Sequence, residues 1–370
     1  MNIPLVDLKR QYLSIKEEID NAIFSVIHDT QFINGKYVAE FEQNFSSLLN
    51  VKHTLGVGNG TDALSIALKT LGVDSGDEVI TVANSFIATS EAITTAGAKV
   101  VFADCNRATY NLDTKDLRAK ITPRTKVIIP VHLYGQPADM TEIMNIAREH
   151  NLFVIEDAAQ GVLAQHKEQN VGTFGDMATF SFYPGKNLGA FGDAGAIVTN
   201  NSELYKKAKM IANHGRIDKY DHEIEGENSR MDGIQGAVLN VKLRYIERWT
   251  QDRIEIAGKY RELLKDVGEI VLQETYPDVE HVYHLFVIRT SRRDGLLAHL
   301  KEKGIGAGIH YPIALHNLKA YKYLNYNPDD FPNANQFSTE VLSLPIFPEL
   351  TDEEISFITS SLKQYFSKIS

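Results

Sequence analysis

Cysteine is nearly absent from this sequence, since Cys105 is the single cysteine among 370 residues. One cysteine cannot form an internal disulfide and cannot supply a cysteine-based zinc site. Long apolar runs are also missing, because no stretch approaches the roughly 20 apolar residues that cross a bilayer. The N-terminus carries Asp7 where a secretory signal would keep an apolar core. We therefore expect a cytoplasmic protein that does not enter a membrane.

Positive charge is scarce, with 38 lysines and arginines against 48 aspartates and glutamates and a formal net charge of −10. This balance argues against bulk binding to nucleic acid, although a locally basic pocket could still bind a small anion. The 43% hydrophobic content, 25 glycines and 11 prolines are ordinary for globular proteins. At roughly 100–200 residues per domain, the length predicts two domains or one large α/β domain with an appendage.

Short apolar segments that alternate with helical patterns dominate the chain from residue 77. The segments are rich in β-branched residues and nearly continuous in apolarity, which is typical of buried parallel strands. We expect strands at Val79–Val82, Lys99–Ala103, Lys126–Val131, Leu152–Ile155, Ala178–Phe182 and Ala194–Thr199, with a helix at Pro137–His150. The alternation predicts an α/β fold with a large, doubly wound and mostly parallel sheet.

The pattern changes after a long helix that we expect at Asp232–Trp249. A second helical stretch continues to about Val267 and is followed by shorter elements. These are a strand at His281–Ile288, a helix at Gly295–Lys303, a strand at Gly306–His310 and a closing helix at Asp352–Tyr365. We predict a large domain of residues 1–248 and a smaller C-terminal α+β domain of residues 249–370.

Lys186 stands in the most distinctive stretch of the sequence, Ser181–Gly189, which contains a Pro-Gly turn directly before the lysine. Taken alone, it could be an ordinary surface lysine. Asp157 ends the expected strand at Leu152–Ile155, and ligands of open α/β sheets bind at the carboxyl ends of the strands. Taken alone, Asp157 could equally cap a helix.

Two further features complete a pattern. Gly56–Asp62 precedes an amphipathic helix, and such a helix start binds anions through free N–H groups and the helix dipole. Phe86 follows the strand at Val79–Val82 and could cover a planar ligand, or it could be a core residue. A lysine, a carboxylate, a phosphate site and an aromatic ring are the parts that pyridoxal phosphate needs.

Other sites are less well supported by the sequence. The glycines at 56, 58 and 60 do not match the spacing of a dinucleotide-binding motif, and no nucleophile elbow of a hydrolase is present. His281 and His284 are three residues apart on an expected strand, so they would point to opposite faces. We therefore predict no metal site.

The chain resembles the sugar aminotransferase family of the DegT/StrS type, which are fold-type I pyridoxal-phosphate enzymes. The resemblance extends from Ile3 nearly to the C-terminus. Its matching segments are Pro4–Leu8, Gly58–Leu64, Glu156–Gln160, Ser181–Asn187, Gly192–Gly195, Asn228–Asp232 and His310–Pro312. The sequence departs from the family at Gly161-Val162-Leu163, where many members carry Ala-His-Gly.

The resemblance implies a role for each motif residue. Lys186 would form the imine with the cofactor, Asp157 would pair with its pyridinium nitrogen, and Gln160 would lie near its phenolic oxygen. Gly60, Thr61 and Ser181 would bind the phosphate, and Asn228 would reach it from the second subunit of a homodimer with shared active sites. Phe86 would stack on the cofactor ring.

The same resemblance favours the subgroup that acts at C-3 of the sugar ring, because of Tyr183-Pro184-Gly185, Gly192–Gly195 and Lys219–His222. The candidate substrate-binding residues are Tyr183, His214, Arg216, Lys219, Tyr220, Arg230, His310, Tyr311 and His316. Acidic residues interleave the cations of the stretch from His214 to Arg230, so a mixed-charge surface loop is the alternative there.

We expect a transaminase that converts a dTDP-3-keto-6-deoxyhexose to the dTDP-3-amino-3,6-dideoxyhexose, with L-glutamate as the amino donor. The alternatives are an aminotransferase acting at C-4 and a non-catalytic, cofactor-binding regulator on the same scaffold. A dehydratase branch of the family replaces the lysine with histidine, and Lys186 argues against that branch. The nucleotide base and the glucose or galactose configuration stay open.

Overall fold

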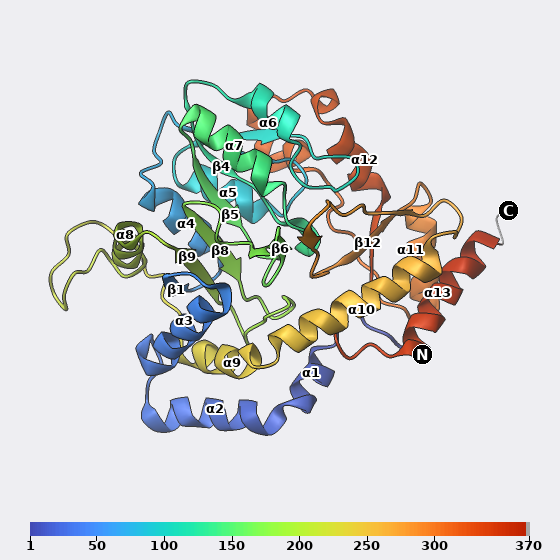
Figure 1. Cartoon of the computed structure of the whole chain (residues 1–370), viewed down its shortest axis with the longest axis horizontal. Helices are drawn as coiled ribbons and strands as arrows, with labels where there is room; N and C mark the ends of the chain where they lie inside the picture. Colours follow the sequence, from blue (N-terminus) through green and yellow to red (C-terminus); the bar gives the residue numbers. More distant parts are fainter. Residues whose placement is uncertain (368–370) are drawn as a thin grey trace.

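A seven-stranded sheet forms the centre of the computed structural model, which describes residues 1–367 (Figure 1). Its strand order is β1-β9-β8-β5-β4-β2-β3. The strands are β1 (His53–Val57), β2 (Glu78–Val82), β3 (Lys99–Ala103), β4 (Thr125–Ile129), β5 (Phe153–Asp157), β8 (Met177–Ser181) and β9 (Gly195–Thr199). Strand β9 is antiparallel to β1 and β8, and the other neighbours pair in parallel. The sheet is therefore mostly parallel, as the sequence predicts.

Helices cover both faces of this sheet. Successive side chains of a strand point to opposite faces, and those of β9 enter two different apolar cores. Ile197 belongs to the core with α4 (Gly60–Thr70) and α7 (Met140–His150). Ala196 and Val198 belong to the core with α3 (Gly35–Leu49) and α9 (Gly233–Leu243). Two covered faces explain why the strands are apolar along their whole length.

The remaining helices of the large unit connect strands or precede the sheet. They are α1 (Leu8–Ser14), α2 (Lys16–Asp29), α5 (Ile87–Thr95), α6 (Thr114–Lys120) and α8 (Ser202–Ala212). A short helical turn, η1 (Leu133–Gly135), follows β4. Helix α2 lies beside α9 at the edge of the molecule (Figure 1). No helix among residues 1–367 is long and apolar enough to cross a membrane.

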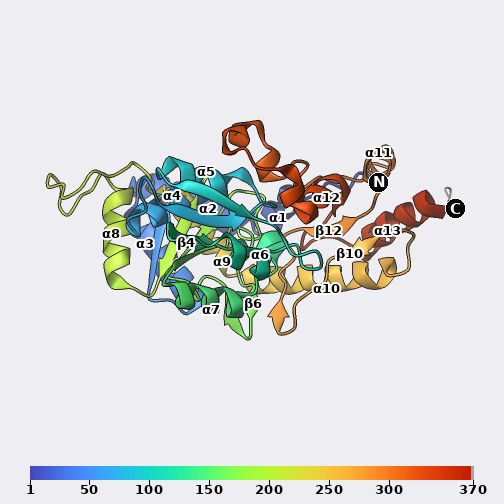
Figure 2. The same ribbon diagram turned by 90° about the horizontal axis from the view of Figure 1, so that it is seen from above.

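A smaller unit lies at one end of the molecule (Figures 1 and 2). Strands β10 (Val271–Leu272), β12 (Phe286–Arg289) and β13 (Val341–Leu344) form an antiparallel sheet. Helices α10 (Ile246–Leu264), α11 (Arg293–Glu302) and α13 (Asp352–Ser367) share a third apolar core with it. Ile3 from the N-terminus also enters this core. The domain boundary near residue 248 stays a prediction.

Short elements link the two units. Strand β11 (Val279–Glu280) pairs with β6 (Gln165–His166), which pairs with β7 (Gln169–Asn170). The helical turns η2 (Leu315–Asn317), η3 (Lys319–Leu324) and η4 (Pro328–Asp330) precede α12 (Pro332–Glu340). Their apolar residues, Leu315 and Tyr321 among them, belong to the first core of the large unit. The chain therefore returns to the large sheet before it completes the smaller unit.

The structure corrects three expected elements. The long helix expected at Asp232–Trp249 is divided, because α9 ends at Leu243 and α10 begins at Ile246. A turn at residues 244–245 lies between them, and the Tyr245 hydroxyl donates to Glu18. The strand expected at His281–Ile288 begins only at Phe286. The strand expected at Gly306–His310 is reduced to a single bridge between Gly308 and Ser343, because this segment also lies against the N-terminus.

Close backbone contact at Gly195 generates a stability prediction. A β-carbon at position 195 would lie 2.4 Å from the carbonyl carbon of Asn59, whereas one at Gly258 in helix α10 meets open space. We expect Gly195→Ala to destabilise the protein by about 1–3 kcal/mol, since backbone must move. Gly258→Ala should stabilise it by up to about 1 kcal/mol through helix propensity.

Thermal unfolding checks both variants. The unfolding midpoint should fall for Gly195→Ala and stay unchanged or rise for Gly258→Ala. Equal midpoints for the two variants would show that the contact between Gly195 and Asn59 does not constrain the fold.

Candidate active site

Three residues from separate segments, two of them polar and one aromatic, lie at the carboxyl ends of the parallel strands. Asp157 is the last residue of β5, and Ser181 is the last residue of β8. Phe86 follows β2 and directly precedes α5. Since the carboxyl ends of parallel strands lie at one edge of a sheet, these residues share the region where α/β proteins bind ligands.

The N-terminus of α4 lies against the end of β8. A β-carbon at Gly60 would lie 2.7 Å from the β-carbon of Ser181, so glycine permits this contact. The Asn59 side chain accepts from the N–H of Asp62 at 2.8 Å, and the N–H of Ala63 donates to the Asn59 carbonyl. The N–H groups of Gly60 and Thr61 precede these bonds and are available to an anion.

Asp157 is buried and held by two donors. Thr89 Oγ1 donates to its Oδ2 at 2.7 Å, and the N–H of Ala159 donates to its Oδ1 at 3.2 Å. Thr89 lies in α5, three residues after Phe86, and the sequence analysis did not include it. Helix α5 contains two further threonines, so the sequence carries no motif that would single out Thr89.

Lys186 closes a turn in which its N–H donates to the Tyr183 carbonyl at 2.8 Å. Burial lowers the pKa of the Lys186 amine to about 8, and the nearby Asp157 carboxylate acts in the opposite direction. A substantial fraction of this amine is therefore neutral near pH 8, whereas an exposed lysine would be almost fully charged. Neutral amines are the form that attacks carbonyl carbon.

Gln160 and Tyr311 lie together beside this group. The Gln160 amide donates to the Tyr311 hydroxyl at 3.3 Å, and the rings of Tyr311 and Phe86 lie 5.8 Å apart. His310 is bonded to Ser343 at 2.9 Å. Burial, followed by the charge of Lys186, lowers the pKa of His310 to about 4, so this imidazole is neutral at physiological pH.

A buried lysine that the sequence analysis missed supports the segment after Lys186. Lys242 in α9 is only 2% exposed, and its ammonium donates to the carbonyl of Gly189 at 2.6 Å. It also lies 4.8 Å from the centre of the Phe191 ring. Burial lowers its pKa to about 8. Lysines on helices are normally solvated, so no sequence signal distinguished this one.

The buried pair of Glu156 and His132, which the sequence did not predict, lies on the opposite side of β5 from Asp157. Glu156 is fully buried and accepts hydrogen bonds from His132 Nε2 and from the backbone N–H groups of Gly172, Phe174 and Gly175. The His132 Nδ1 accepts from the N–H of Ala138. This network fixes the end of β5, and with it the position of Asp157.

His284 contacts the residue that follows Lys186. The Asn187 amide donates to the Val282 carbonyl at 3.1 Å, so its oxygen faces His284 Nδ1, at 3.3 Å. His284 must then carry a proton on Nδ1. Burial and the charge of Lys186 hold its pKa well below the usual range. His281 instead forms a hydrogen bond with Gln273. Neither histidine lies on a strand, so the expectation that they point to opposite faces of one strand is wrong.

Residues 1–367 contain no group of three or more side chains that could hold a metal ion, and the absence of a metal site stays a prediction. Asp157 accepts a hydrogen bond from Thr89, His284 is hydrogen-bonded to Asn187, and His310 is hydrogen-bonded to Ser343.

Several predicted substrate-binding residues lie on a loop that projects from the end of α8 (Figure 1). Tyr220 is 84% exposed, with the Lys219 ammonium 5.3 Å from its ring centre. Arg230 donates to the amide oxygen of the exposed Asn228. Within residues 1–367, no hydrogen bond joins this loop to Lys186 or Asp157. His214 and Arg216 lie at the start of the same loop.

The remaining candidates divide into two groups. Tyr183 is exposed in the turn before Lys186. His316 is buried, its ring stacks on Phe331 at 4.1 Å, and its Nε2 bonds Asn335. The structure thus places His316 in a packing contact, and its role in substrate binding stays a prediction.

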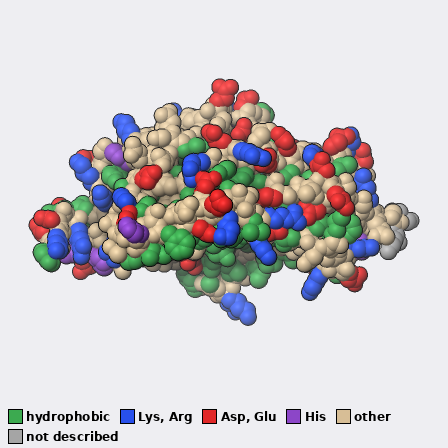
Figure 3. Space-filling model, turned by 90° about the horizontal axis from the view of Figure 1, so that it is seen from below, with side chains coloured by type: hydrophobic (Ala, Val, Ile, Leu, Met, Phe, Trp, Pro, Cys, Tyr) green, Lys and Arg blue, Asp and Glu red, His purple; other side chains and the backbone are tan. Residues whose placement is uncertain are grey.

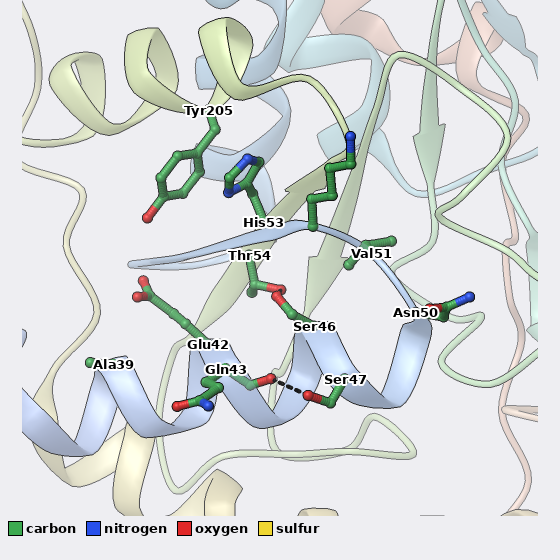
Figure 4. Close-up of a pocket in the computed structure, with 11 residues that line it drawn as sticks. Ala39, Glu42, Gln43, Ser46, Ser47, Asn50, Val51, His53, Thr54 and Tyr205 are labelled. Atoms are coloured by element: carbon green, nitrogen blue, oxygen red, sulfur yellow. Dashed lines mark hydrogen bonds between the residues drawn. The ribbon is translucent and has the colours of Figure 1, made fainter.

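A separate surface pocket of about 520 Å³ lies between α3, β1 and α8 (Figure 4). Polar side chains dominate it, including Glu42, Ser46, His53 and Tyr205. None of the predicted site residues lines this pocket. The candidate active site is therefore distinct from it.

Comparisons with known proteins agree along the chain. The model of the DegT/DnrJ/EryC1/StrS aminotransferase family matches residues 13–363. A Geobacillus stearothermophilus protein named pleiotropic regulatory protein is 44% identical over 368 residues, 99% of each chain. The Aneurinibacillus thermoaerophilus dTDP-3-amino-3,6-dideoxy-alpha-D-galactopyranose transaminase is 42% identical and covers 98% of this chain and 99% of its own. The Acidithiobacillus ferrooxidans UDP-N-acetyl-3-dehydro-alpha-D-glucosamine 3-aminotransferase is 41% identical, covering 98% and 97%.

Solved structures give the same result. The crystal structure of Streptomyces venezuelae DesV superposes with a TM-score of 0.98 at 38% identity over 100% of both chains. Bacillus subtilis NtdA with bound cofactor PMP gives 0.89 at 35% identity, covering 96% of this chain and 82% of its own. The PLP form of the sugar aminotransferase Spr1654 from Streptococcus pneumoniae gives 0.90 at 25% identity, covering 96% and 97%.

The proximity of Asp157 to Lys186 generates a prediction about the lysine alone. In Asp157→Asn, the negative charge that raises the Lys186 pKa is lost, while burial remains. We therefore expect the pKa of Lys186 to fall below its wild-type value of about 8. The measurement is the pH dependence of Lys186 labelling by an amine-reactive reagent, followed by mass spectrometry on protein with no small molecule bound.

Lys186→Ala serves as the control for labelling at this position. An unchanged or higher labelling midpoint in Asp157→Asn would show that the two side chains do not interact as described.

Proposed function

The chain belongs to the DegT/DnrJ/EryC1/StrS aminotransferase family, and from this premise we propose that it aminates C-3 of a dTDP-linked keto-sugar. The family confirms the resemblance seen in the motifs and the fold-type I architecture. The protein is a sugar aminotransferase, and its cofactor is pyridoxal phosphate. The substrate, the position of amination and the residue roles are the proposal.

The residues at the sheet edge fit this cofactor. Lys186 offers a partly neutral amine, and Asp157 offers a buried carboxylate beside it. The free N–H groups at the start of α4 suit a phosphate, and Ser181 lies against them. The observation that carries the proposal is the Lys186 amine, whose pKa is lowered by burial to about 8 and raised by the nearby charge of Asp157.

When bound, pyridoxal phosphate supplies an electron sink that makes carbon–hydrogen bonds next to the amino group acidic. The Lys186 Nζ accepts a proton from the α-carbon of the amino donor and later delivers one to the sugar carbon that carried the ketone. Asp157 keeps the pyridine nitrogen protonated through a charge-assisted hydrogen bond. Thr89 holds the Asp157 carboxylate in place for this task. One lysine therefore performs both proton transfers.

The sugar is proposed to be a dTDP-3-keto-6-deoxyhexose, with L-glutamate as the amino donor. Tyr183, Pro184 and Gly185 form the turn before Lys186, and Gly192–Gly195 follows it, so both segments shape the floor next to the reacting amine. The names of the Aneurinibacillus and Acidithiobacillus enzymes refer to a 3-amino sugar and a 3-dehydro sugar, respectively. A shift of about 1 Å at a reacting centre can cost about 10²-fold in rate, so this floor is able to select the ring position.

A homodimer is proposed as the active unit. Exposed apolar side chains are concentrated on α1, α2 and the segment after them, namely Leu13, Phe24, Ile27, Phe32 and Ile33. Figure 3 views this side of the molecule, and hydrophobic side chains gather across its middle. A contiguous apolar surface of this kind favours association. Asn228 is exposed and pairs with Asn213 at the base of the projecting loop, where it is accessible to a second subunit.

The second candidate function is regulation without catalysis, which the name of the Geobacillus relative suggests for that protein. Lys186 argues against a regulator here, because burial lowers the pKa of its amine to about 8, a value that suits a nucleophile and proton carrier. A binding protein that only holds the cofactor does not need an amine poised for proton transfer. Amination at C-4 is the other alternative, and it differs in the ring position alone.

Matched 3-keto and 4-keto dTDP-sugars with L-glutamate test the proposed function. We expect faster amination of the 3-keto sugar, with the position of the nitrogen established by NMR, and no turnover by Lys186→Ala. Asp157→Asn should bind the cofactor but turn over much more slowly. Faster reaction at C-4 would refute the proposed ring position. Faster reaction of the matching UDP-sugars would show that the substrate carries a different nucleotide base.

Absorbance spectroscopy distinguishes a transaminase from a non-catalytic regulator. In a transaminase, L-glutamate changes the absorbance band of the bound cofactor without any sugar present. A band that no amino donor changes would favour the regulator.

Mixed dimers test the shared site. Lys186→Ala and Asn228→Ala chains should each be inactive, because one lacks the reacting amine and the other an arm of the phosphate site. After subunit exchange, one site of each mixed dimer should contain Lys186 and an intact Asn228 of the partner subunit, so activity should return. Exchange that is demonstrated by mass spectrometry but restores no activity would contradict the arrangement.

A further inference from the structure

Tyr134 connects three segments that surround the active site. It lies in η1 directly after β4, is fully buried, and has a φ of 61°. Its N–H donates to Gln160 Oε1 at 2.6 Å, its carbonyl accepts from the N–H of Leu285 at 3.2 Å, and its hydroxyl donates to the carbonyl of His310. A left-handed backbone at a bulky residue is uncommon, and here it places all three groups.

The bond to Gln160 orients the glutamine amide. Because Gln160 Oε1 accepts from Tyr134, the amide nitrogen turns to the other side and donates to the Tyr311 hydroxyl. Tyr311 directly follows His310, the residue whose carbonyl accepts from Tyr134. Tyr134, Gln160, Tyr311 and His310 therefore form a closed circuit of contacts between the large sheet and the segment that returns from the smaller unit.

Neighbouring backbone keeps this circuit tight. A β-carbon at Gly135 would lie 2.9 Å from the nitrogen of His284, so only glycine allows the segments to approach. The N–H of Val282 donates to the Gly135 carbonyl at 3.0 Å. Burial raises the pKa of the Tyr134 phenol well above its usual range, so the hydroxyl remains a donor at all working pH values.

We propose that Tyr134 is a positioning residue of the aminotransferase, which sets the pocket through the His310 carbonyl and the Gln160 side chain without touching substrate. The idea rests on the proposed function, because it takes Gln160 as a cofactor residue and Tyr311 as a sugar residue, the roles that the sequence predicts for them. Loss of the hydroxyl removes the bond between the large sheet and the His310 carbonyl, so that Tyr311 is tied to Tyr134 through Gln160 alone. The sugar side of the site then loses its fixed wall, while Lys186 and Asp157 keep their own contacts.

Tyr134→Phe isolates this contribution, since it removes one oxygen and retains the buried ring. Tyr110→Phe is the matched control, because Tyr110 is equally buried, its ring centre lies 6.4 Å from that of Tyr134, and its hydroxyl makes no hydrogen bond to Gln160, Tyr311 or His310. We expect KM for the keto-sugar to rise about tenfold in Tyr134→Phe, the upper range for one hydrogen bond. The kcat should change by less than about threefold, and Tyr110→Phe should behave as wild type.

A second measurement needs no sugar. The visible circular dichroism of the cofactor-loaded holoenzyme reports the asymmetric surroundings of the bound ring, and it should weaken in Tyr134→Phe but not in Tyr110→Phe. If wild type fails to process the keto-sugars yet this difference persists, the proposed substrate is wrong and the positioning role stands. Unchanged dichroism together with an unchanged KM in a folded Tyr134→Phe protein would overturn the role of Tyr134.

Hydrogen exchange on the wild-type holoenzyme keeps the idea testable if Tyr134→Phe does not fold. Peptides covering residues 133–136, 157–161, 282–286 and 308–312 should share one level of protection, because the bonds of a single residue join them. Free exchange in residues 308–312, with strong protection in the other three, would refute the circuit.

Discussion

The desolvated amine of Lys186, held near the buried carboxylate of Asp157, is the interaction on which the rest of the site depends. Burial lowers the pKa of the amine to about 8, and Asp157 limits that fall. A solvated lysine would remain charged and could not act as a nucleophile, and a lysine without the carboxylate would lack a partner of opposite charge. The same burial that makes the amine useful also destabilises its charged form, so the surrounding protein must hold it in place.

Close contacts between backbone segments provide that support. Gly60 allows the start of α4 to reach Ser181, and Gly195 allows β9 to pass directly beside Asn59. Lys242 holds the loop after Lys186 through the Gly189 carbonyl, and Glu156 fixes the end of β5 from the face opposite Asp157. The residues proposed to carry the chemistry thus lie on a rigid sheet edge, and the segments on either side of Lys186 are proposed to select the ring position. Most of the other candidate substrate-binding residues lie on the projecting loop and on the returning C-terminal segment. This division is consistent with relatives of one family whose names refer to different nucleotide sugars.

The elements that the sequence predicted well are those with a strong local pattern. The strand at Lys99–Ala103 agrees with β3 at both ends, because its alternation with helices and its β-branched residues leave little choice. The predictions failed where contacts between distant segments decide the backbone. The expected helix at Asp232–Trp249 is divided by a turn at residues 244–245, where Tyr245 contacts Glu18, far away in the chain. The segment at His281–Leu285 follows the backbone of Gly135 in place of forming a strand. Three-residue spacing on an assumed strand was therefore an unsafe basis for the orientation of His281 and His284.

The sequence by itself determined the fold class, the family and the identity of Lys186, Asp157, Gly60 and Gln160 as the motif residues, because each stands in a short segment with a local signature. Only the tertiary structure decided that Thr89 holds Asp157, that Lys242 is buried against Gly189, and that Tyr134 joins Gln160 to His310. The physical reason is that hydrogen bonds of this kind join residues up to 176 positions apart in the chain. Such partners are chosen by the packing of the sheet, its helices and the returning segment, and no local pattern records them.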